Sequence, residues 1–208
     1  MIKKYFSIVT FVFITQFIYG QVNYGIKFGM NYSKVTVDHN FPEIEVANYN
    51  GNKLGFHIGV MLKIPVNKKL SFSTEILYSD KGSSNDLGSD TSYYEFNLYY
   101  INMPIIANYN IYKSLYIQLG IEPGYLSSIN DDDYYQKIAK SYYNSFDLGA
   151  LIGIEYYIKK IGIGLRYGQS IIPISDFEYR NQEGAMIGTS KSYNRNIQAY
   201  FTYLIRSN

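Results

Sequence analysis

The chain has 208 residues, with 19 Lys and Arg, 17 Asp and Glu, and no cysteine. The lack of cysteine excludes disulfide bonds, thiolate metal sites and cysteine nucleophiles, and the near-neutral charge gives no electrostatic basis for nucleic-acid binding. Tyrosine is abundant, at 25 residues, and so many amphipathic rings require an interface between apolar and polar surroundings.

The N-terminus has the three parts of a secretory signal peptide. The charged "MIKK" precedes the apolar run "YFSIVTFVFITQFIY", and Gly20 offers a small residue for cleavage. The run is short for a membrane-spanning helix, and no cysteine follows it for lipid attachment. We therefore expect residues 1–20 to be removed, which leaves one domain over 21–208 with 17 residues of each charge, because Lys3 and Lys4 are lost.

Alternation of apolar and polar residues with a period of two recurs along the rest of the chain and predicts β-strands. The expected strands, in chain order, are residues 22–33, 54–65, 70–79, 92–108, 115–125, 146–156, 161–170 and 195–206. The fourth is irregular around Pro104, which has no N–H for the ladder, so a bulge or a change of register is expected there.

The connections between these strands alternate in length. The expected long, polar loops are residues 33–53, 81–91, 128–144 and 170–194, and the expected short turns are residues 66–69, 109–113 and 158–160. This regular alternation indicates an up-and-down meander with all its long loops at one end. Both termini then lie at the short-turn end.

The volume of the strand side chains decides which parity faces inward. An eight-stranded barrel has an interior just wide enough for side chains to fill. The apolar parity offers about five bulky groups per strand, too many for that space, whereas the other parity is rich in glycine, serine and a few charges. A barrel with its apolar face outward needs lipid around it, which excludes a soluble barrel of lipocalin type. The predicted fold is therefore all-β: a closed, eight-stranded, antiparallel, up-and-down transmembrane β-barrel.

Tyrosines near the strand ends are typical of the aromatic girdles of such barrels. The tyrosines in question are Tyr24, Tyr32, Tyr78, Tyr125, Tyr156, Tyr167 and Tyr203. Five lysines fall at the short turns, where they could meet anionic headgroups: Lys68, Lys69, Lys113, Lys159 and Lys160.

Charged residues of both signs lie on the inward parity in nearly equal numbers. They are Lys27, Lys63, Arg166 and Arg206, with Glu75, Glu95, Glu122, Asp147 and Glu155, and His57 lies among them. Buried charges persist only when they are paired and hydrogen-bonded, so this set predicts a structural network that plugs the lumen. We expect Arg166 to contact Glu122, Asp147 or Glu155.

Sequence motifs for catalysis or for metal and cofactor binding are weak. Small outer-membrane barrels include acyltransferases that use loop histidine, aspartate and serine, and the candidate set here is His39, Asp38 and Ser33. The acidic run "NDDDYYQK" at residues 130–137 could attract calcium, but it lacks the glycine and glutamate of a calcium loop. We expect no catalytic, cofactor or metal site.

Two segments carry a resemblance to a known family. "KLSFSTEILYSDKG" and "YYINMPIIANYN" resemble the PorT-like outer-membrane protein β-barrel domain family, and "YGIKFGMNYS" is similar to its first strand. The matching residues are Glu75, Tyr78, Lys81, Gly82, Tyr100 and Pro104. The resemblance implies insertion into the outer membrane of a Gram-negative cell by the barrel assembly machinery, although this chain ends "FTYLIRSN", without the usual final aromatic residue.

The functional expectation is a structural or interaction protein of the outer membrane, and not an enzyme. Its expected partners are membrane lipid, lipopolysaccharide, the assembly machinery and a protein bound by the long loops, with no nucleic acid. One relative in the PorT-like family serves type IX secretion, so an accessory role in a secretion apparatus is the alternative. A lipid-modifying enzyme is the third interpretation.

Overall fold

The computed structural model describes residues 22–40, 51–86, 93–131, 142–181 and 183–206. These residues form ten strands. The strands are β1 (Asn23–His39), β2 (Lys53–Pro65), β3 (Leu70–Asp86), β4 (Tyr93–Asn102), β5 (Ile105–Tyr112), β6 (Leu115–Asp131), β7 (Phe146–Ile158), β8 (Ile161–Ser170), β9 (Ser175–Arg180) and β10 (Met186–Arg206). Within the described segments, no helix is long and apolar enough to cross a membrane.

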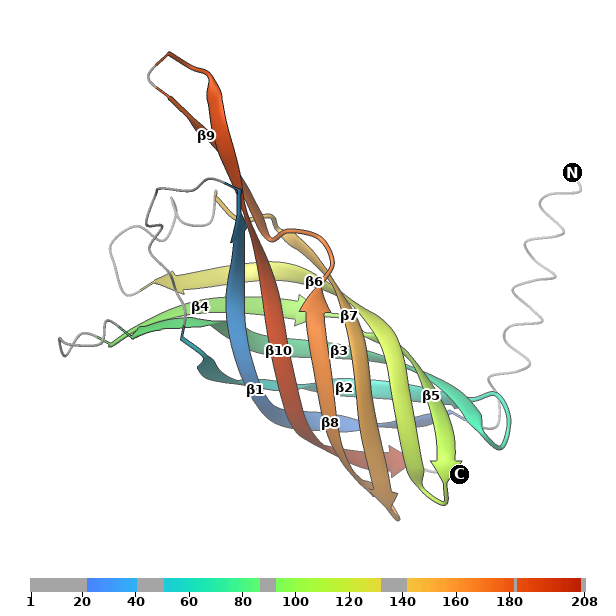
Figure 1. Cartoon of the computed structure of the whole chain (residues 1–208). Helices are drawn as coiled ribbons and strands as arrows, with labels where there is room; N and C mark the ends of the chain where they lie inside the picture. Colours follow the sequence, from blue (N-terminus) through green and yellow to red (C-terminus); the bar gives the residue numbers. More distant parts are fainter. Residues whose placement is uncertain (1–21, 41–50, 87–92, 132–141, 182, 207–208) are drawn as a thin grey trace, which may run out of the picture.

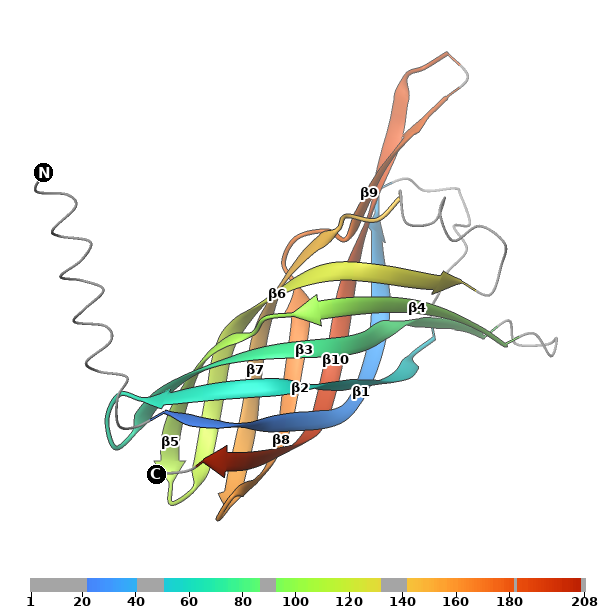
Figure 2. The ribbon, with the colours of Figure 1, turned by 180° about the vertical axis from the view of Figure 1, so that it is seen from behind.

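All strand pairs are antiparallel, and the sheet follows the order β1-β2-β3-β4-β6-β7-β8-β10-β9. β10 pairs with both β8 and β1, so the hydrogen-bonded path returns to its first strand. The strands therefore surround an interior, as Figure 1 and the reverse view in Figure 2 show. The short turns that join β5 to β6 and β7 to β8 lie at the same end as the last residues of β10, which we call the short-turn end.

The expected irregularity around Pro104 is confirmed. The predicted single strand is split into β4, which ends at Asn102, and β5, which begins at Ile105. β4 pairs with the far half of β3, and β5 pairs with Leu70–Thr74 at its start. Both pieces also pair with β6, so together they fill one gap between β3 and β6.

The strands reach further into the expected long loops than the alternation indicated, and here the predicted loop boundaries are wrong. β1 continues to His39, β3 to Asp86 and β6 to Asp131. The expected loop 170–194 contains a β-hairpin, in which β9 pairs with the first residues of β10. This hairpin projects beyond the ring at the end opposite the short turns, the loop end (Figure 1). Near the loop end the regular alternation of burial ends, as in residues 79–84, which are all buried, so the pattern on which the prediction relied no longer marks these parts of the strands.

The direction of the side chains is as the sequence predicts: apolar outward and polar inward. β8 alternates between exposed residues, such as Ile163 and Leu165, and buried ones, such as Gly164 and Arg166. The tyrosines proposed for the girdles are all on the outer face, with 40–55% of their surface exposed.

Two apolar clusters occupy the interior near its ends. Toward the short-turn end, Met61, Tyr157 and Leu204 pack together with Tyr116 beside them. Toward the loop end the cluster is larger and consists of Val35, Phe96, Leu98, Tyr100, Leu126, Ile129 and Ile174, with Tyr143 packed against it. The polar interior lies between these two clusters.

Candidate functional site

The centre of the interior is an ion pair between β8 and β3. Both terminal nitrogens of the Arg166 guanidinium donate to the two carboxylate oxygens of Glu75, each at 3.1 Å. Each residue is 1% exposed, so the pair is withdrawn from water. The expected partners of Arg166, which were Glu122, Asp147 and Glu155, are wrong: the long side chain reaches across the interior to another strand. A bidentate arginine–carboxylate pair fixes geometry as well as charge.

A glutamine and a tyrosine connect this pair to a second carboxylate. Gln118 accepts hydrogen bonds from Arg166 Nε at 3.1 Å and from the Tyr200 hydroxyl at 2.8 Å. Its amide nitrogen donates to Glu155 at 3.0 Å. The other oxygen of Glu155 accepts from Thr202 at 3.2 Å. All four carboxylate oxygens of Glu75 and Glu155 therefore have donors.

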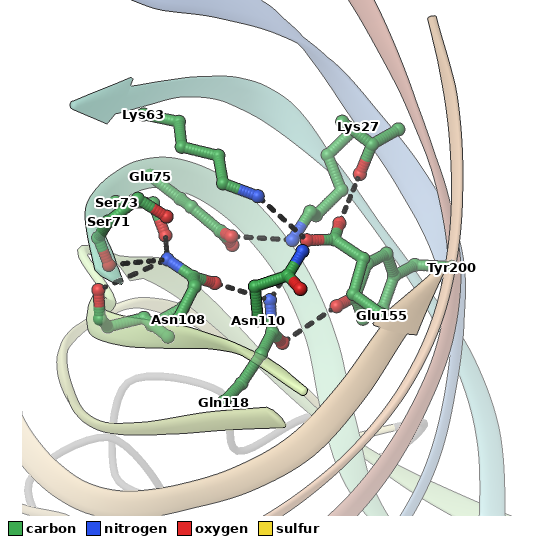
Figure 3. Close-up of polar contacts among 12 residues, drawn as sticks. Lys27, Lys63, Ser71, Ser73, Glu75, Asn108, Asn110, Gln118, Glu155 and Tyr200 are labelled. Carbon is green, nitrogen blue, oxygen red and sulfur yellow. Dashed lines mark hydrogen bonds and ion pairs between the residues drawn. The ribbon is translucent and has the colours of Figure 1, made fainter. Parts of the chain in front are cut away.

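Two lysines complete the centre. Lys27 forms an ion pair with Glu75, and its ammonium lies 3.8 Å from the centre of the Tyr200 ring. Lys63 is 3.9 Å from a Glu155 oxygen and 3.9 Å from the centre of the Tyr116 ring. We call Lys27, Lys63, Glu75, Gln118, Glu155, Arg166 and Tyr200 the core network. Figure 3 labels every member except Arg166 and shows how these side chains converge from separate strands inside the ring.

Glycine on β8 makes room for the core network. A Cβ atom on Gly164 would lie 2.2 Å from Cζ of the Tyr200 ring. Alanine or any larger residue at this position would displace the Tyr200 side chain, whose hydroxyl accepts a hydrogen bond from Arg166 and donates one to Gln118. The alternating glycines of "IGIGLRYGQS" are therefore a packing requirement of the interior.

A separate cavity lies nearer the loop end. It has a volume of about 10 Å³ and is lined by Lys81, Glu122, Asp147, Gly149, Leu151, Gly168, Gln169, Ser170, Asn194 and Asn196. Lys81 donates to Oε1 of Glu122 at 2.6 Å, and Asn194 donates to Oδ2 of Asp147 at 2.9 Å. The second oxygens of both carboxylates have no hydrogen-bond partner among the described residues. We call this space the loop-side cavity.

The sequence prediction missed three buried charges because all three lie outside the predicted strands. Lys81 continues the inward parity of β3, so a longer strand would have identified it. Lys53 is the first residue of β2 and donates to Asp80 at 2.6 Å. Asp80 has the outward parity of β3 but is 8% exposed, because residues 79–84 are all buried and the alternation ends there. No local pattern in the sequence marks that change.

The three other residues that were predicted to lie in the lumen differ in how deeply they are buried. His57 is buried beside the core network, and its Nδ1 lies 2.8 Å from Oδ1 of Asn31. The Asn31 amide nitrogen already donates to two carbonyls, so Nδ1 of His57 is the donor in this contact. Glu95 is half-buried on β4. Arg206 is exposed at the last residue of β10, so its predicted place in the lumen is wrong, since the interior ends at Leu204.

The candidate catalytic residues do not form a cluster. Ser33 is buried inside the ring, whereas Asp38 and His39 are exposed at the far end of β1. Ser33 and His39 are six positions apart along the strand, which is about 20 Å. Within the described parts of the chain, no group of three or more acidic or histidine side chains could hold a metal ion. The acidic run at 130–137 falls mostly on residues 132–137, outside the described residues, as does the expected signal peptide.

Comparison with known protein families gives one match. The model of the family described as "Outer membrane protein beta-barrel domain" matches residues 15–176. The chain belongs to this family. It is therefore an outer-membrane β-barrel protein, in agreement with a ring whose apolar side chains face outward.

Solved structures that match the chain include outer-membrane proteins of low sequence identity. Neisserial surface protein A is 15% identical over 86% of this chain and 96% of its own, with a TM-score of 0.47. Ail, the attachment invasion locus protein of Yersinia pestis, is 11% identical over 86% of this chain and 99% of its own, with a TM-score of 0.40. The outer membrane protease OmpT from Escherichia coli is 8% identical over 89% of this chain and 97% of its own, with a TM-score of 0.40. No curated protein sequence matches the chain.

Proposed function

We propose that the chain is an eight-stranded barrel with a closed lumen, which serves the outer membrane as a structural and interaction protein. The count of eight treats β4 and β5 as one interrupted strand, since they share the gap between β3 and β6. It leaves out β9, which pairs with β10 in the projecting hairpin. An interior of this size is filled by its own side chains.

The core network is the observation that carries this proposal. The Arg166–Glu75 pair spans the interior from β8 to β3, and Lys27 joins it from β1. An apolar cluster lies on each side of the network along the barrel. A solute would have to break buried ion pairs to pass, at a cost of about 3–5 kcal/mol for each unpaired charge. This favours a plug over a channel.

A liposome-swelling assay tests the closed lumen. Vesicles that contain the purified protein should not swell in small sugars, whereas vesicles with an open porin should. The matched variant Arg166→Ala combined with Glu75→Ala, which removes both partners of the central pair, should admit more solute than the unmodified protein. Swelling of unmodified vesicles at the porin rate would disprove the plug.

The loop end supports the interaction role. With short turns in the periplasm, as in other barrels of the outer membrane, the projecting hairpin faces outside the cell. Met186 and Ile187 are 54% and 47% exposed there, beside the exposed ion pair of Arg180 and Glu178. Chemical cross-linking of intact cells tests this surface. Replacement of both apolar residues by serine should abolish the cross-linked adduct of the protein with its partner, whereas Glu178→Gln should retain the adduct. Identical adducts in all three proteins would count against this surface.

The outer face is expected to contact lipid and lipopolysaccharide, the short-turn lysines to meet headgroups, and the barrel assembly machinery to insert the chain. Export requires cleavage after Gly20, and N-terminal sequencing of the mature protein should begin at Gln21.

A role in a secretion apparatus is the second candidate. The PorT-like motif residues favour it, and Glu75 and Lys81 of that motif lie in the core network and the loop-side cavity. Comparison of secreted proteins between a deletion strain and its parent tests this role. A secretion defect that Arg166→Leu reproduces would indicate that the apparatus needs the intact barrel.

A further inference from the structure

We propose that the loop-side cavity binds one monovalent cation. Its proposed ligands are three oxygen atoms of residues that line the cavity: Oε2 of Glu122, Oδ1 of Asp147 and Oδ1 of Asn196. Each is buried and has no hydrogen-bond partner among the described residues. The three residues are 5%, 3% and 4% exposed, so bulk water does not solvate them.

The net charge of the cavity lining is negative and favours a positive ion. Its lining holds two carboxylates, Glu122 on β6 and Asp147 on β7, and one cation, Lys81 on β3. The residues contributed by β8 and β10 are uncharged. The lining therefore carries one negative charge in excess, and an uncompensated charge is costly inside a protein.

A water molecule would not complete this site. Water has two hydrogens, so it can donate to only two of the three free oxygens, and it leaves the excess charge in place. A cation accepts electron pairs from all three oxygens and cancels the charge. Hard cations such as sodium take carboxylate and amide oxygens as ligands. The cavity volume of about 10 Å³ has room for one particle of the size of water, which limits the occupant to a single small ion.

The test is thermal unfolding of the full-length mature protein in detergent, in sodium chloride and in choline chloride of equal ionic strength and pH. Choline is too large for the cavity and serves as the inert cation. With sodium at about ten times its dissociation constant, Tm should be roughly 3–6 °C higher than in choline. Equal Tm values in the two salts would overturn the proposal, and this is also the result that a bound water molecule would give.

Two variants locate the effect. Asp147→Asn removes the excess charge, and Asn196→Ala removes one oxygen without a change of charge. Both should lose most of the difference between the two salts, and the control Glu178→Gln on the hairpin should keep it. A full sodium effect in Asp147→Asn or Asn196→Ala would disprove the site.

A measurement on the unmodified protein avoids any failure of the variants to fold. Sodium-23 relaxation should be faster with the folded protein than with the same concentration of heat-unfolded protein, and potassium in excess should reverse the difference. No difference between folded and unfolded samples would overturn the proposal. A change of Tm with pH but not with sodium would show a bound proton in place of the metal ion, and would overturn it as well.

Discussion

The core network and the loop-side cavity each hold two buried carboxylates, but they satisfy them differently. In the core network, Glu75 and Glu155 have a donor on every oxygen. In the cavity, Glu122 and Asp147 each have a donor on one oxygen only, within the described part of the structure. The core network has three cations for two carboxylates, whereas the cavity has one cation for two. A fully satisfied network favours rigidity, whereas a partly satisfied one leaves buried oxygen atoms whose loss of hydration is not compensated.

The largest effect is expected from loss of the central arginine. Arg166→Leu leaves the Tyr200 hydroxyl oxygen without a donor, Gln118 with the Tyr200 hydroxyl alone and Glu75 with Lys27 alone, which should destabilise the barrel by about 3–5 kcal/mol. The control, Lys191→Leu, breaks an exposed pair with Asp176 at 3.6 Å and should cost no more than about 1 kcal/mol. Heat-modifiable migration on gels measures the difference, and equal losses would refute the structural role of the network.

Loss of the cavity lysine should have a smaller and salt-dependent effect. Lys81→Met leaves both oxygens of Glu122 without a donor and raises the excess charge of the cavity, at a cost of about 2–3 kcal/mol in choline chloride. Sodium should recover part of this loss, because a cation can replace the lysine charge. Sodium should restore none of the stability lost in Arg166→Leu. Equal recovery in the two variants would contradict the proposed difference between the core network and the loop-side cavity.

The sequence predicted the direction of side chains well, because alternation is a local property of each strand. Ile163 and Arg166 point outward and inward as their parity requires, and Pro104 interrupts the ladder where its missing N–H indicated. The partners were not predictable in the same way. Whether Arg166 meets Glu75 or Glu155 depends on the stagger of all strands around the ring, which no single segment encodes.

The charges near the loop end were missed for a different reason. Lys53 has the inward parity of β2 but precedes the predicted start of that strand, whereas Asp80 lies where the alternation of β3 ends, so parity cannot assign it a face. The cavity was missed because it depends on the absence of donors around Glu122 and Asp147. Such an absence is a property of packing between five strands, whereas the presence of a charge is visible in the sequence.

The space around two glycines shows how tightly the core network and the loop-side cavity are packed. A Cβ on Gly164, beside the core network, would lie 2.2 Å from the Tyr200 ring, whereas the nearest atom to a Cβ on Gly149, beside the cavity, is 3.4 Å away. Gly164→Ala should therefore lower the free energy of unfolding by about 1–3 kcal/mol through overpacking. Gly149→Ala should change it by no more than about 0.5 kcal/mol. The Tm of each variant in choline chloride provides the measurement, and a larger loss in Gly149→Ala would reverse the comparison.

The smallest effect is expected at a short turn, outside both regions. Lys159 has a φ of 55°, which costs a residue with a Cβ about 1–2 kcal/mol relative to glycine. Lys159→Gly relieves this strain but adds about 0.5–1 kcal/mol of backbone entropy to the unfolded chain, so the two nearly cancel and Tm should change by no more than about 2–4 °C. Because the same substitution deletes an exposed charge, it also measures how much a surface lysine contributes. If Lys159→Gly changed Tm as much as Gly164→Ala does, stability would not be concentrated in the core network, and the contrast between a rigid centre and a binding cavity would lose its basis.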